Sequence, residues 1–381
     1  MDFMFSVPTQ AFFGPGKSEM VGDMLKGMGA KKIMVVYDQG VKAAGIVDKV
    51  LVNVKAAGIE YTEYSDVLPN PPEYLVNQGY EIAKNLGIDA MLAVGGGSSI
   101  DFAKAVNILL TNPGPFSQYN GVNLVKNPVK PLIAIPTTAG TGSEVTNACV
   151  ITDTVNKEKM TILGQFVAPS IALVDANLTL GLPPAITAST GMDALTHAVE
   201  AYLSKWASPA SDSLAICAIE MIARSIEKAV NQGSDLAARE DMIVGSAIAG
   251  MAFSQTDLGL AHAIAAPMGA HCGTAHGVAN AIVLGLTLEY NLPSCAPKLK
   301  EIAKVMNIKV DGLSDEAAAE LAVKRINEIT RNIKIPTLQE VGVTKDKFDD
   351  IADGALINSA ARTNPREVTK ECVIEILTRA F

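Results

Sequence analysis

The sequence predicts an α/β domain with a mostly parallel sheet, followed by an all-helical C-terminal domain. Two observations lead to this prediction. Up to about residue 183, short continuous apolar segments alternate with segments of helical periodicity, as expected for parallel strands buried on both faces. After Pro183-Pro184 the strand signals stop and only long helical patterns follow. We therefore expect two domains, residues 1–184 and 185–381.

The first domain alternates strands and helices, and the second contains helices alone. The predicted strands are Ile33–Val36, Ala90–Val94, Leu132–Ile135 and Ile171–Val174. Helices are predicted between them at Val41–Ala57, Glu73–Leu86 and Ile100–Leu110. In the second domain, helices are predicted at Ala188–Trp206, Asp212–Asn231, Leu236–Ser254, Val278–Asn291, Ala317–Arg331 and Thr369–Arg379.

Composition excludes several classes of partner. Of the 381 residues 49% are hydrophobic and 19% charged, the balance of a compact globular protein. The net charge of −9 argues against nucleic acid and against an anionic membrane surface. No signal peptide and no apolar run of membrane-spanning length is evident. The five scattered cysteines are typical of reduced thiols, so we expect a cytoplasmic protein.

A glycine-rich segment follows one predicted strand. Gly95-Gly96-Gly97-Ser98 leads directly into a helix, where free backbone N–H groups and the helix dipole favour an anion such as a pyrophosphate. Ser98 is the expected N-cap, with Asp101 in the capping-box position. A tight strand-to-helix turn without a ligand is the alternative.

A second polar loop, Thr137–Ser143, follows the strand that ends at Pro136. It offers four hydroxyl groups and two glycines, and such loops at strand carboxyl ends are where open α/β sheets bind nucleotides. Neither loop contains the G-K-[ST] of a P-loop, which disfavours phosphoryl transfer, and G-x-G-x-x-G is absent.

Asp38 ends the strand that begins at Ile33. A carboxylate there can accept hydrogen bonds from a ribose 2′-hydroxyl and would repel a 2′-phosphate, which favours NAD over NADP. A turn-forming aspartate before Gly40 is the alternative.

All four histidines of the chain lie between residues 197 and 276. Asp193 and His197 are four residues apart, so both project from one face of a helix. Between His262 and His276, Pro267, Gly269 and Gly273 interrupt any single helix, so we expect two elements to present these imidazoles. One carboxylate and three imidazoles form a divalent-metal set that suits Fe²⁺ or Zn²⁺ and leaves room for a substrate oxygen.

These segments resemble the iron-dependent (group III) alcohol dehydrogenases, a family that includes lactaldehyde reductase and 1,3-propanediol dehydrogenase. The resemblance covers nearly the full chain. Its most specific segments are Gly95–Ser98 with Asp101 and Lys104, Pro136–Glu144, Gly191–His197 and His276–Asn280. It implies a dehydroquinate synthase-like fold and an NAD-dependent oxidoreductase that interconverts a small primary alcohol or diol with its aldehyde. A homodimer is also implied.

The resemblance further implies which residues hold the metal and the cofactor. It places Fe²⁺, or Zn²⁺ in some members, on Asp193, His197, His262 and His276. It assigns NAD contacts to Asp38, Asn70, Gly96, Gly97, Ser98, Thr137, Thr138, Thr141, Ser143, Thr146 and Lys159. Phe253 would lie beside the nicotinamide and the substrate.

Three positions depart from the family pattern. Many members carry a histidine four residues after the third metal ligand, thought to help relay the proton, where this chain has Ala266. His271 stands where an aromatic residue is common, and Gly285-Leu286 replaces a usual Pro-His. We expect the proton to leave through bound water and a ribose hydroxyl, aided by His271. His271 and Phe253 are thus the candidate catalytic residues.

Three other functions stay open. One is a zinc-dependent polyol dehydrogenase of the glycerol type, which metal analysis and reconstitution with Fe²⁺ or Zn²⁺ would distinguish. A metal-dependent lyase or cyclase of the dehydroquinate synthase type would need more lysines and arginines than the site segments contain. A catalytically idle metal- or nucleotide-binding protein is the third. Neither the substrate nor the direction of the reaction follows from the sequence.

Overall fold

A computed structural model of the chain describes residues 2–156 and 158–381. The chain forms two compact units. One unit is Val7–Gly181, and the other is Leu182–Phe381 together with the N-terminal residues up to Ser6.

A six-stranded sheet forms the centre of the first unit, with the strand order β1-β9-β6-β4-β2-β3. Every neighbouring pair in it is parallel. The strands are β1 (Gln10–Phe13), β2 (Lys32–Val36), β3 (Glu60–Tyr64), β4 (Ala90–Gly95), β6 (Leu132–Pro136) and β9 (Ile171–Val174). Because β2, β4 and β6 are adjacent and parallel, the loops after them emerge at the same edge of the sheet.

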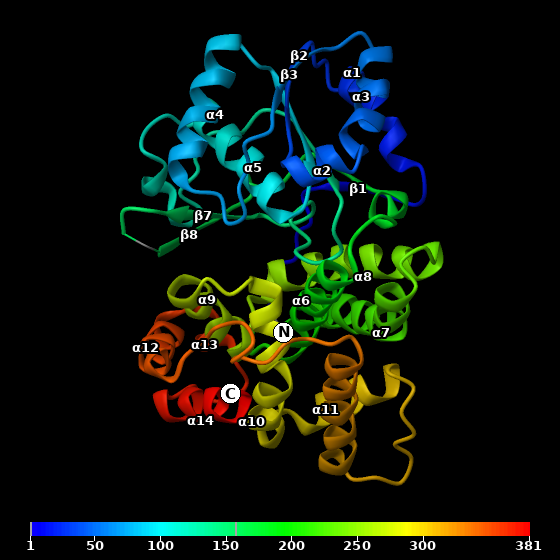
Figure 1. The fold of residues 1–381 in the computed structure, drawn as a ribbon, viewed down its shortest axis with the longest axis vertical. Coiled ribbons are helices and arrows are strands. Elements are labelled where there is room, and N and C mark those ends of the chain that lie inside the picture. The colour runs from blue at the N-terminus through cyan, green and yellow to red at the C-terminus, as the bar shows by residue number, and fades with distance from the viewer. Residues whose placement is uncertain (1, 157) are drawn as a thin grey trace. The chain divides into compact units, whose positions relative to one another are not determined.

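Helices cover both faces of this sheet (Figure 1). Side chains alternate along β2, so Ile33 and Val35 pack in one buried cluster, while Met34 and Val36 pack in the other. The first cluster includes residues of α1 (Val21–Gly27) and α3 (Ile46–Ala56); the second includes residues of α4 (Glu73–Leu86) and α5 (Gly97–Thr111). The short helix α2 (Gln39–Ala43) and three 3₁₀ turns, η1 (Lys17–Met20), η2 (Phe116–Tyr119) and η3 (Ala176–Thr179), complete the connections.

A smaller three-stranded sheet lies beside α5 in the same unit. Its order is β5-β8-β7, formed by β5 (Gly121–Val122), β7 (Ala148–Asp153) and β8 (Glu158–Leu163). Strands β7 and β8 are antiparallel, whereas β5 and β8 are parallel.

The second unit is helical, as Figure 1 shows. Its helices are α6 (Pro184–Leu203), α7 (Pro209–Asn231), α8 (Leu236–Thr256), α9 (Leu260–Cys272), α10 (His276–Val305), α11 (Asp315–Asn332), α12 (Phe348–Ile357), α13 (Ser359–Thr363) and α14 (Lys370–Ala380), with a 3₁₀ turn η4 (Lys345–Lys347). Helices α6, α7 and α8 pack against one another, and α10 packs against α6, α9 and α11.

The structure confirms the predicted α/β and helical organisation and all four predicted strands. The predicted helix Val41–Ala57 is divided in two, because the chain turns between α2 and α3. Pro267 lies within α9 and does not end it; the break between the imidazoles comes after Cys272, so two helices present them as expected. Strands β1 and β3 and the second sheet were not predicted.

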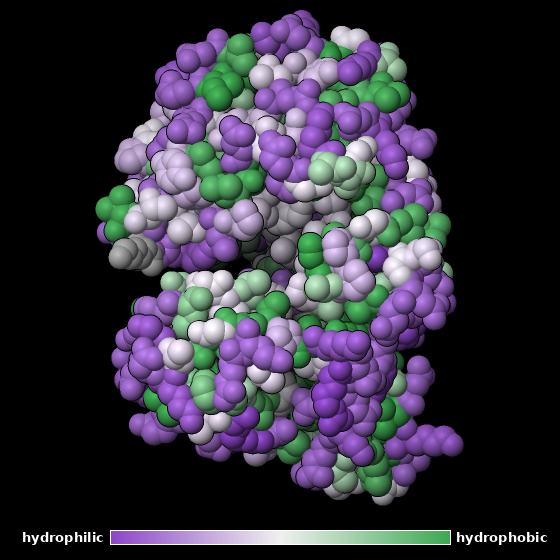
Figure 2. All heavy atoms as spheres, in the orientation of Figure 1, coloured by the Kyte–Doolittle hydropathy of each residue, from purple (hydrophilic) through white to green (hydrophobic). Residues whose placement is uncertain are grey.

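Within the described residues, no helix combines the length and the apolar composition that crossing a membrane would require. On the face shown in Figure 2, hydrophobic side chains are scattered among hydrophilic ones. Such scattered apolar residues are normal for the surface of a folded protein.

Candidate metal centre and nucleotide-binding loops

The predicted metal ligands come together in the helical unit. Asp193 and His197 lie one turn apart on α6, His262 lies in the first turn of α9, and His276 is the first residue of α10. One ligand atom from each of the four lies within 4.8 Å of the others. Three helices therefore converge on one point with a carboxylate and three imidazoles.

The cluster is mostly buried. Asp193, His197 and His262 are at most 5% exposed, whereas the side chain of His276 is 45% exposed. The imidazole of His262 stacks on that of His197 with ring centroids 4.6 Å apart. Phe253 on α8 also stacks on His197, with ring centroids 4.5 Å apart. The partly open side is thus that of His276, where a small molecule could approach.

The two nitrogens of His262 have different surroundings. Its Nδ1 atom lies 2.6 Å from Oε2 of Glu200, and a carboxylate only accepts, so Nδ1 carries the hydrogen. Its Nε2 atom therefore presents a lone pair. That atom is buried and has no hydrogen-bond partner in the part of the chain that the structure describes. An orphaned imidazole lone pair 3.8 Å from the Asp193 carboxylate fits a divalent metal ion held between them.

Asp193 is also held in place by a neighbour. The side-chain amide of Asn280 on α10 donates a 2.8 Å hydrogen bond to Oδ1 of Asp193. Burial alone would raise the pKa of Asp193, but the three surrounding imidazoles and this hydrogen bond outweigh it, so the net pKa is lowered. The carboxylate is thus kept as an anion, the form that ligates a metal.

The turn between α8 and α9 is tightly constrained. Asp257 has a φ of 55° and a ψ of −168°, a region that side-chain-bearing residues rarely adopt. Its Oδ1 atom accepts a 2.8 Å hydrogen bond from the amide of Leu258. The turn connects Phe253 near the end of α8 with His262 at the start of α9, and the rings of both residues stack on His197.

His271 and Ala266 lie on different sides of α9. Ala266 is one turn after His262 and therefore on the same face of the helix. His271 is nine residues after His262, which is about 14 Å along the axis and half a turn around it. It is exposed in the last turn of α9. A proton relay through His271 therefore needs intervening water.

The predicted cofactor residues lie in the α/β unit, many of them at one edge of the large sheet. Asp38 follows β2, Gly96 follows β4 and Thr137 follows β6, and these strands are neighbours. Oδ1 of Asp38 accepts hydrogen bonds from the amides of Gly40 and Val41 and caps α2. Its Oδ2 atom faces the first glycine loop and accepts a 3.3 Å hydrogen bond from Ser99. Asp38 therefore combines a structural cap with a carboxylate oxygen directed at the loop.

The two polar loops touch. A Cβ atom placed on Gly97 would lie 2.8 Å from Cγ2 of Thr141, so a larger residue would force the Thr141 side chain to move. The predicted N-cap was wrong: α5 begins at Gly97 with Gly96 as its N-cap, and no side chain caps it. Ser98 instead lies within the first turn, so the free amides of the helix start remain available to an anion.

Asp101 and Lys104 tie helix α5 to the second loop. Asp101 accepts hydrogen bonds from the Ser143 hydroxyl at 2.5 Å and from the amide of Val150 at 3.0 Å. Lys104 is fully buried and donates to Ser143 at 3.0 Å and to the Thr146 hydroxyl at 3.3 Å. The hydroxyls of Ser143 and Thr146, both predicted cofactor contacts, thus already bind this buried pair.

Two other predicted contacts, Asn70 and Lys159, form a separate pair. Asn70 has a φ of 53°, and its Oδ1 atom accepts a 2.6 Å hydrogen bond from Nζ of Lys159. Lys159 also donates to the Thr152 hydroxyl at 3.0 Å. Burial lowers the pKa of Lys159 to about 8.

Sequence reasoning missed the roles of Glu200 and Asn280. Glu200 lies three residues after His197 and Asn280 four residues after His276, so each shares a helix face with a ligand. This spacing was a usable signal for both. What it does not reveal is the long-range partner of each residue, which only the packing of three helices determines.

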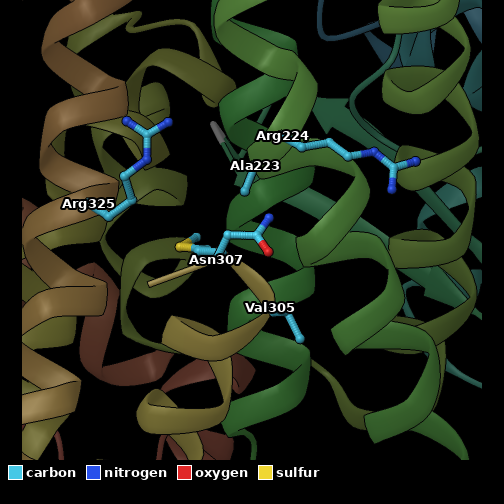
Figure 3. A pocket seen from close by; sticks show the side chains of 6 residues that line it. Ala223, Arg224, Val305, Asn307 and Arg325 are labelled. Carbon is cyan, nitrogen blue, oxygen red and sulfur yellow. The ribbon is translucent and has the colours of Figure 1, made fainter. Parts of the chain in front are cut away.

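A small pocket of about 110 Å³ lies at the far end of α10 from His276 and is drawn in Figure 3. Arg224 and Arg325 line it, but both guanidinium groups are paired, with Asp241 and Glu227 respectively. Because its charges are neutralised, this pocket does not resemble an anion site.

Comparison with known proteins identifies the family. Residues 8–176 match the family model described as iron-containing alcohol dehydrogenase, and residues 187–381 match that of its C-terminal part. The chain is 42% identical to 1,3-propanediol dehydrogenase of Citrobacter freundii, covering 100% of this chain and 99% of the relative. It is 39% identical to lactaldehyde reductase of Escherichia coli strain K12, covering 97% of each.

Solved structures agree with this assignment. A crystal structure of 1,3-propanediol oxidoreductase superposes with a TM-score of 0.98 at 41% identity, covering 100% of both chains. NADH-dependent butanol dehydrogenase A of Thermotoga maritima gives a TM-score of 0.88 at 26% identity, covering 100% of this chain and 98% of the other. These matches do not favour the zinc-dependent polyol alternative. The chain belongs to the iron-containing alcohol dehydrogenase family.

Proposed function

We propose that this protein interconverts a small primary alcohol or diol with its aldehyde, using NAD(H) and an Fe²⁺ ion bound by Asp193, His197, His262 and His276. Relatives named for propanediol and lactaldehyde support the substrate class. The observation that carries the proposal is the environment of His262, whose buried Nε2 atom lacks a hydrogen-bond partner among the described residues while its Nδ1 atom is bound to Glu200.

Each group at the proposed site has its own task. A bound Fe²⁺ would act as a Lewis acid that lowers the pKa of the alcohol, and Zn²⁺ could substitute. Asp193 supplies negative charge, which offsets part of the charge of the cation. Phe253, stacked on His197, gives the substrate an apolar wall beside the ligands. Ala266 lies on the His262 face of α9, and its small side chain leaves a wider and less polar space for the substrate than a histidine would.

We propose that NAD(H) binds along the carboxyl ends of β2, β4 and β6. Bound there, NAD(H) would supply the hydride acceptor for alcohol oxidation and the hydride donor for carbonyl reduction. The start of α5 would hold the pyrophosphate, and Asp38 would accept from the adenosine ribose. The remaining contacts are proposed at Asn70, Gly96, Gly97, Ser98, Thr137, Thr138, Thr141 and Lys159, with Ser143 and Thr146 supporting the second loop.

His271 is proposed as an aid to proton release, acting through water because it lies on the opposite face of α9 from His262. We also propose that the two compact units are the two domains, with their boundary near residue 184. Family resemblance supports a homodimer. Five free cysteines support a reducing compartment such as the cytoplasm.

A substrate panel with anaerobically reconstituted enzyme tests the proposed reaction. The enzyme is loaded with Fe²⁺, and NADH absorbance is followed with 1,3-propanediol, 1,2-propanediol, ethanol, butanol, glycerol and the corresponding aldehydes. We expect turnover of short primary alcohols and aldehydes, lost on chelation and restored by Fe²⁺. A preference for glycerol with Zn²⁺ would favour the polyol alternative, and no turnover of any of them would contradict the proposal.

A further inference from the structure

Glu200 occupies a buried position directly behind the ligand cluster. It lies on α6, seven residues after Asp193 and three after His197, so α6 presents all three side chains on one face. Glu200 is 5% exposed. A buried carboxylate is stable only if several donors surround it, so its partners should account for its presence.

Among the described residues, the hydrogen-bond donors to Glu200 belong to the start of α9. Its Oε2 atom accepts a 2.9 Å hydrogen bond from the amide of Gly259, and its Oε1 atom accepts a 2.6 Å bond from the amide of Ala261. The amide of His262 points at Oε2 from 3.4 Å. The fourth donor is the His262 ring itself, through Nδ1 at 2.6 Å. One carboxylate thus binds both the backbone and the side chain of a proposed metal ligand.

Residue 259 shows how closely Glu200 approaches α9. A Cβ atom on Gly259 would lie 2.8 Å from Oε1 of Glu200 and 3.0 Å from its Cδ. Glycine is therefore required for this contact. The amides at a helix start also carry partial positive charge, which stabilises an anion there.

A neighbouring side chain, Asn364, also binds the start of α9. Its Oδ1 atom accepts a 3.2 Å hydrogen bond from the amide of Leu260, and its Nδ2 atom donates to Asn291 at 2.8 Å. Asn364 is fully buried. It provides a natural comparison, because it binds the start of α9 as Glu200 does, while its side-chain hydrogen bonds go to Leu260, Asn291 and Arg366.

We propose that Glu200 is a positioning residue that fixes the hydrogen of His262 on Nδ1 and so aims the Nε2 lone pair at the metal. The Glu200 carboxylate accepts one hydrogen bond from the imidazole of His262 and others from the backbone amides at the start of α9. It therefore fixes the orientation of the ring relative to α6, which carries Asp193 and His197. Glu200 and the metal then polarise one imidazole from opposite sides, which makes His262 a better ligand. This inference rests on the proposed metal site.

The test compares metal affinity in Glu200→Gln, Asn364→Ala and the unaltered enzyme. Each full-length protein is freed of metal with a chelator, its Tm is recorded, and Co²⁺ is titrated against a competing chelator while the visible absorption of bound Co²⁺ is followed. Glutamine keeps the size of the side chain but replaces one accepting oxygen by a donor that opposes the α9 amides. We expect Glu200→Gln to weaken Co²⁺ binding about 10- to 100-fold and to alter the absorption bands.

Asn364→Ala should lower the metal-free Tm while leaving Co²⁺ affinity within about threefold of the unaltered enzyme. Glu200→Asp, which keeps the negative charge, should recover part of the affinity and replaces Glu200→Gln if that variant does not fold. Equal Co²⁺ affinity and absorption in the Glu200 variants and the unaltered enzyme would overturn the inference. Failure of the unaltered enzyme to bind Co²⁺ at all would instead overturn the proposed metal site.

Discussion

The ammonium group of Lys104 donates a 2.6 Å hydrogen bond to the carbonyl oxygen of Ala148, 44 residues later in the chain. Lys104 is fully buried, and its Nζ atom lies 3.7 Å from Oδ1 of Asp101. Burial lowers the pKa of Lys104, while Asp101, Cys149 and Glu144 oppose that shift. This one cation therefore holds the second polar loop against the helix that begins at the first.

Replacing Lys104 by methionine should destabilise the protein and weaken cofactor binding. The change leaves the Asp101 carboxylate buried without its cation, which costs about 3–5 kcal/mol when a buried pair is broken. The loop that Lys104 anchors should also become less ordered, so the KM for NAD should rise more than kcat falls. Thermal unfolding and steady-state kinetics measure the two effects.

Lys298→Met is the matched control. Lys298 pairs with Asp212 but its side chain is 35% exposed, so its loss should change stability by about 1 kcal/mol or less. If Lys104→Met and Lys298→Met lower the Tm by the same amount, the buried pair of Lys104 and Asp101 does not stabilise the protein more than an exposed ion pair does.

Asp38→Asn should raise the use of NADP relative to NAD. Asparagine caps a helix as well as aspartate does, so α2 should be preserved while the charge that repels a 2′-phosphate is removed. We expect the NADP/NAD ratio of kcat/KM to rise about tenfold or more, or about 1.4 kcal/mol. Asp48→Asn, at an acid paired with Lys42, should leave the ratio unchanged. An unaltered ratio in Asp38→Asn and in Asp38→Gly would exclude the proposed role.

Lys159 should give cofactor binding a dependence on pH. Its pKa, lowered by burial to about 8, means that the ammonium is present below that pH and is lost above it. If this group binds the cofactor phosphates, kcat/KM for NAD should fall as the pH rises through about 8. Lys159→Arg, which keeps its charge, should flatten that limb, and Lys159→Met should be low throughout. The same limb in Lys159→Arg as in the unaltered enzyme would assign the titration to another group.

The proposed proton path can be tested by removing one imidazole, at His271, and by adding one at Ala266. His271→Ala should shift the pH profile of kcat/KM while metal content stays full, because the proposed water relay loses its acceptor. Ala266→His adds an imidazole on the His262 face of α9, so its effect on the profile should be larger. Metal analysis of both variants is the control. A profile unmoved by His271→Ala removes His271 from the relay.

The elements predicted correctly are those whose burial leaves a local pattern. Strands β2, β4, β6 and β9 are almost wholly buried and therefore appear as continuous apolar runs. Strand β3 reads Glu-Tyr-Thr-Glu-Tyr because it lies at an edge of the sheet, and such a polar strand gives no apolar run. Strand β7 alternates between buried and half-buried residues, but its sequence, Ala-Cys-Val-Ile-Thr-Asp, does not alternate apolar with polar residues and so gives no period-two signal.

In the candidate site, too, the residues predicted correctly are those with a local sequence signal. The clustering of histidines and the spacing of Asp193 and His197 led to a ligand set that the fold brings together. The role of Glu200 was not predicted because its hydrogen-bond partners lie on α9, 59 to 62 residues later in the chain. The predicted Ser98 cap was wrong because α5 already begins at Gly97, and a run of glycines carries no side chain that would mark the first residue of the helix.

Strand β1 has a consequence for the order of assembly on the ribosome. It pairs with β9 in the described sheet, and the adjoining Thr9 hydroxyl bonds to Pro169, 160 residues later. The amide of Ser6 donates a hydrogen bond to the side chain of Gln255, which is synthesised 249 residues later. During synthesis β2, β3, β4 and β6 can therefore pair before β1 has a partner, so β1 precedes these strands in the chain but joins the sheet after them. A fusion attached before Gln10 would accordingly disturb the closing step of folding and leave its early steps unchanged.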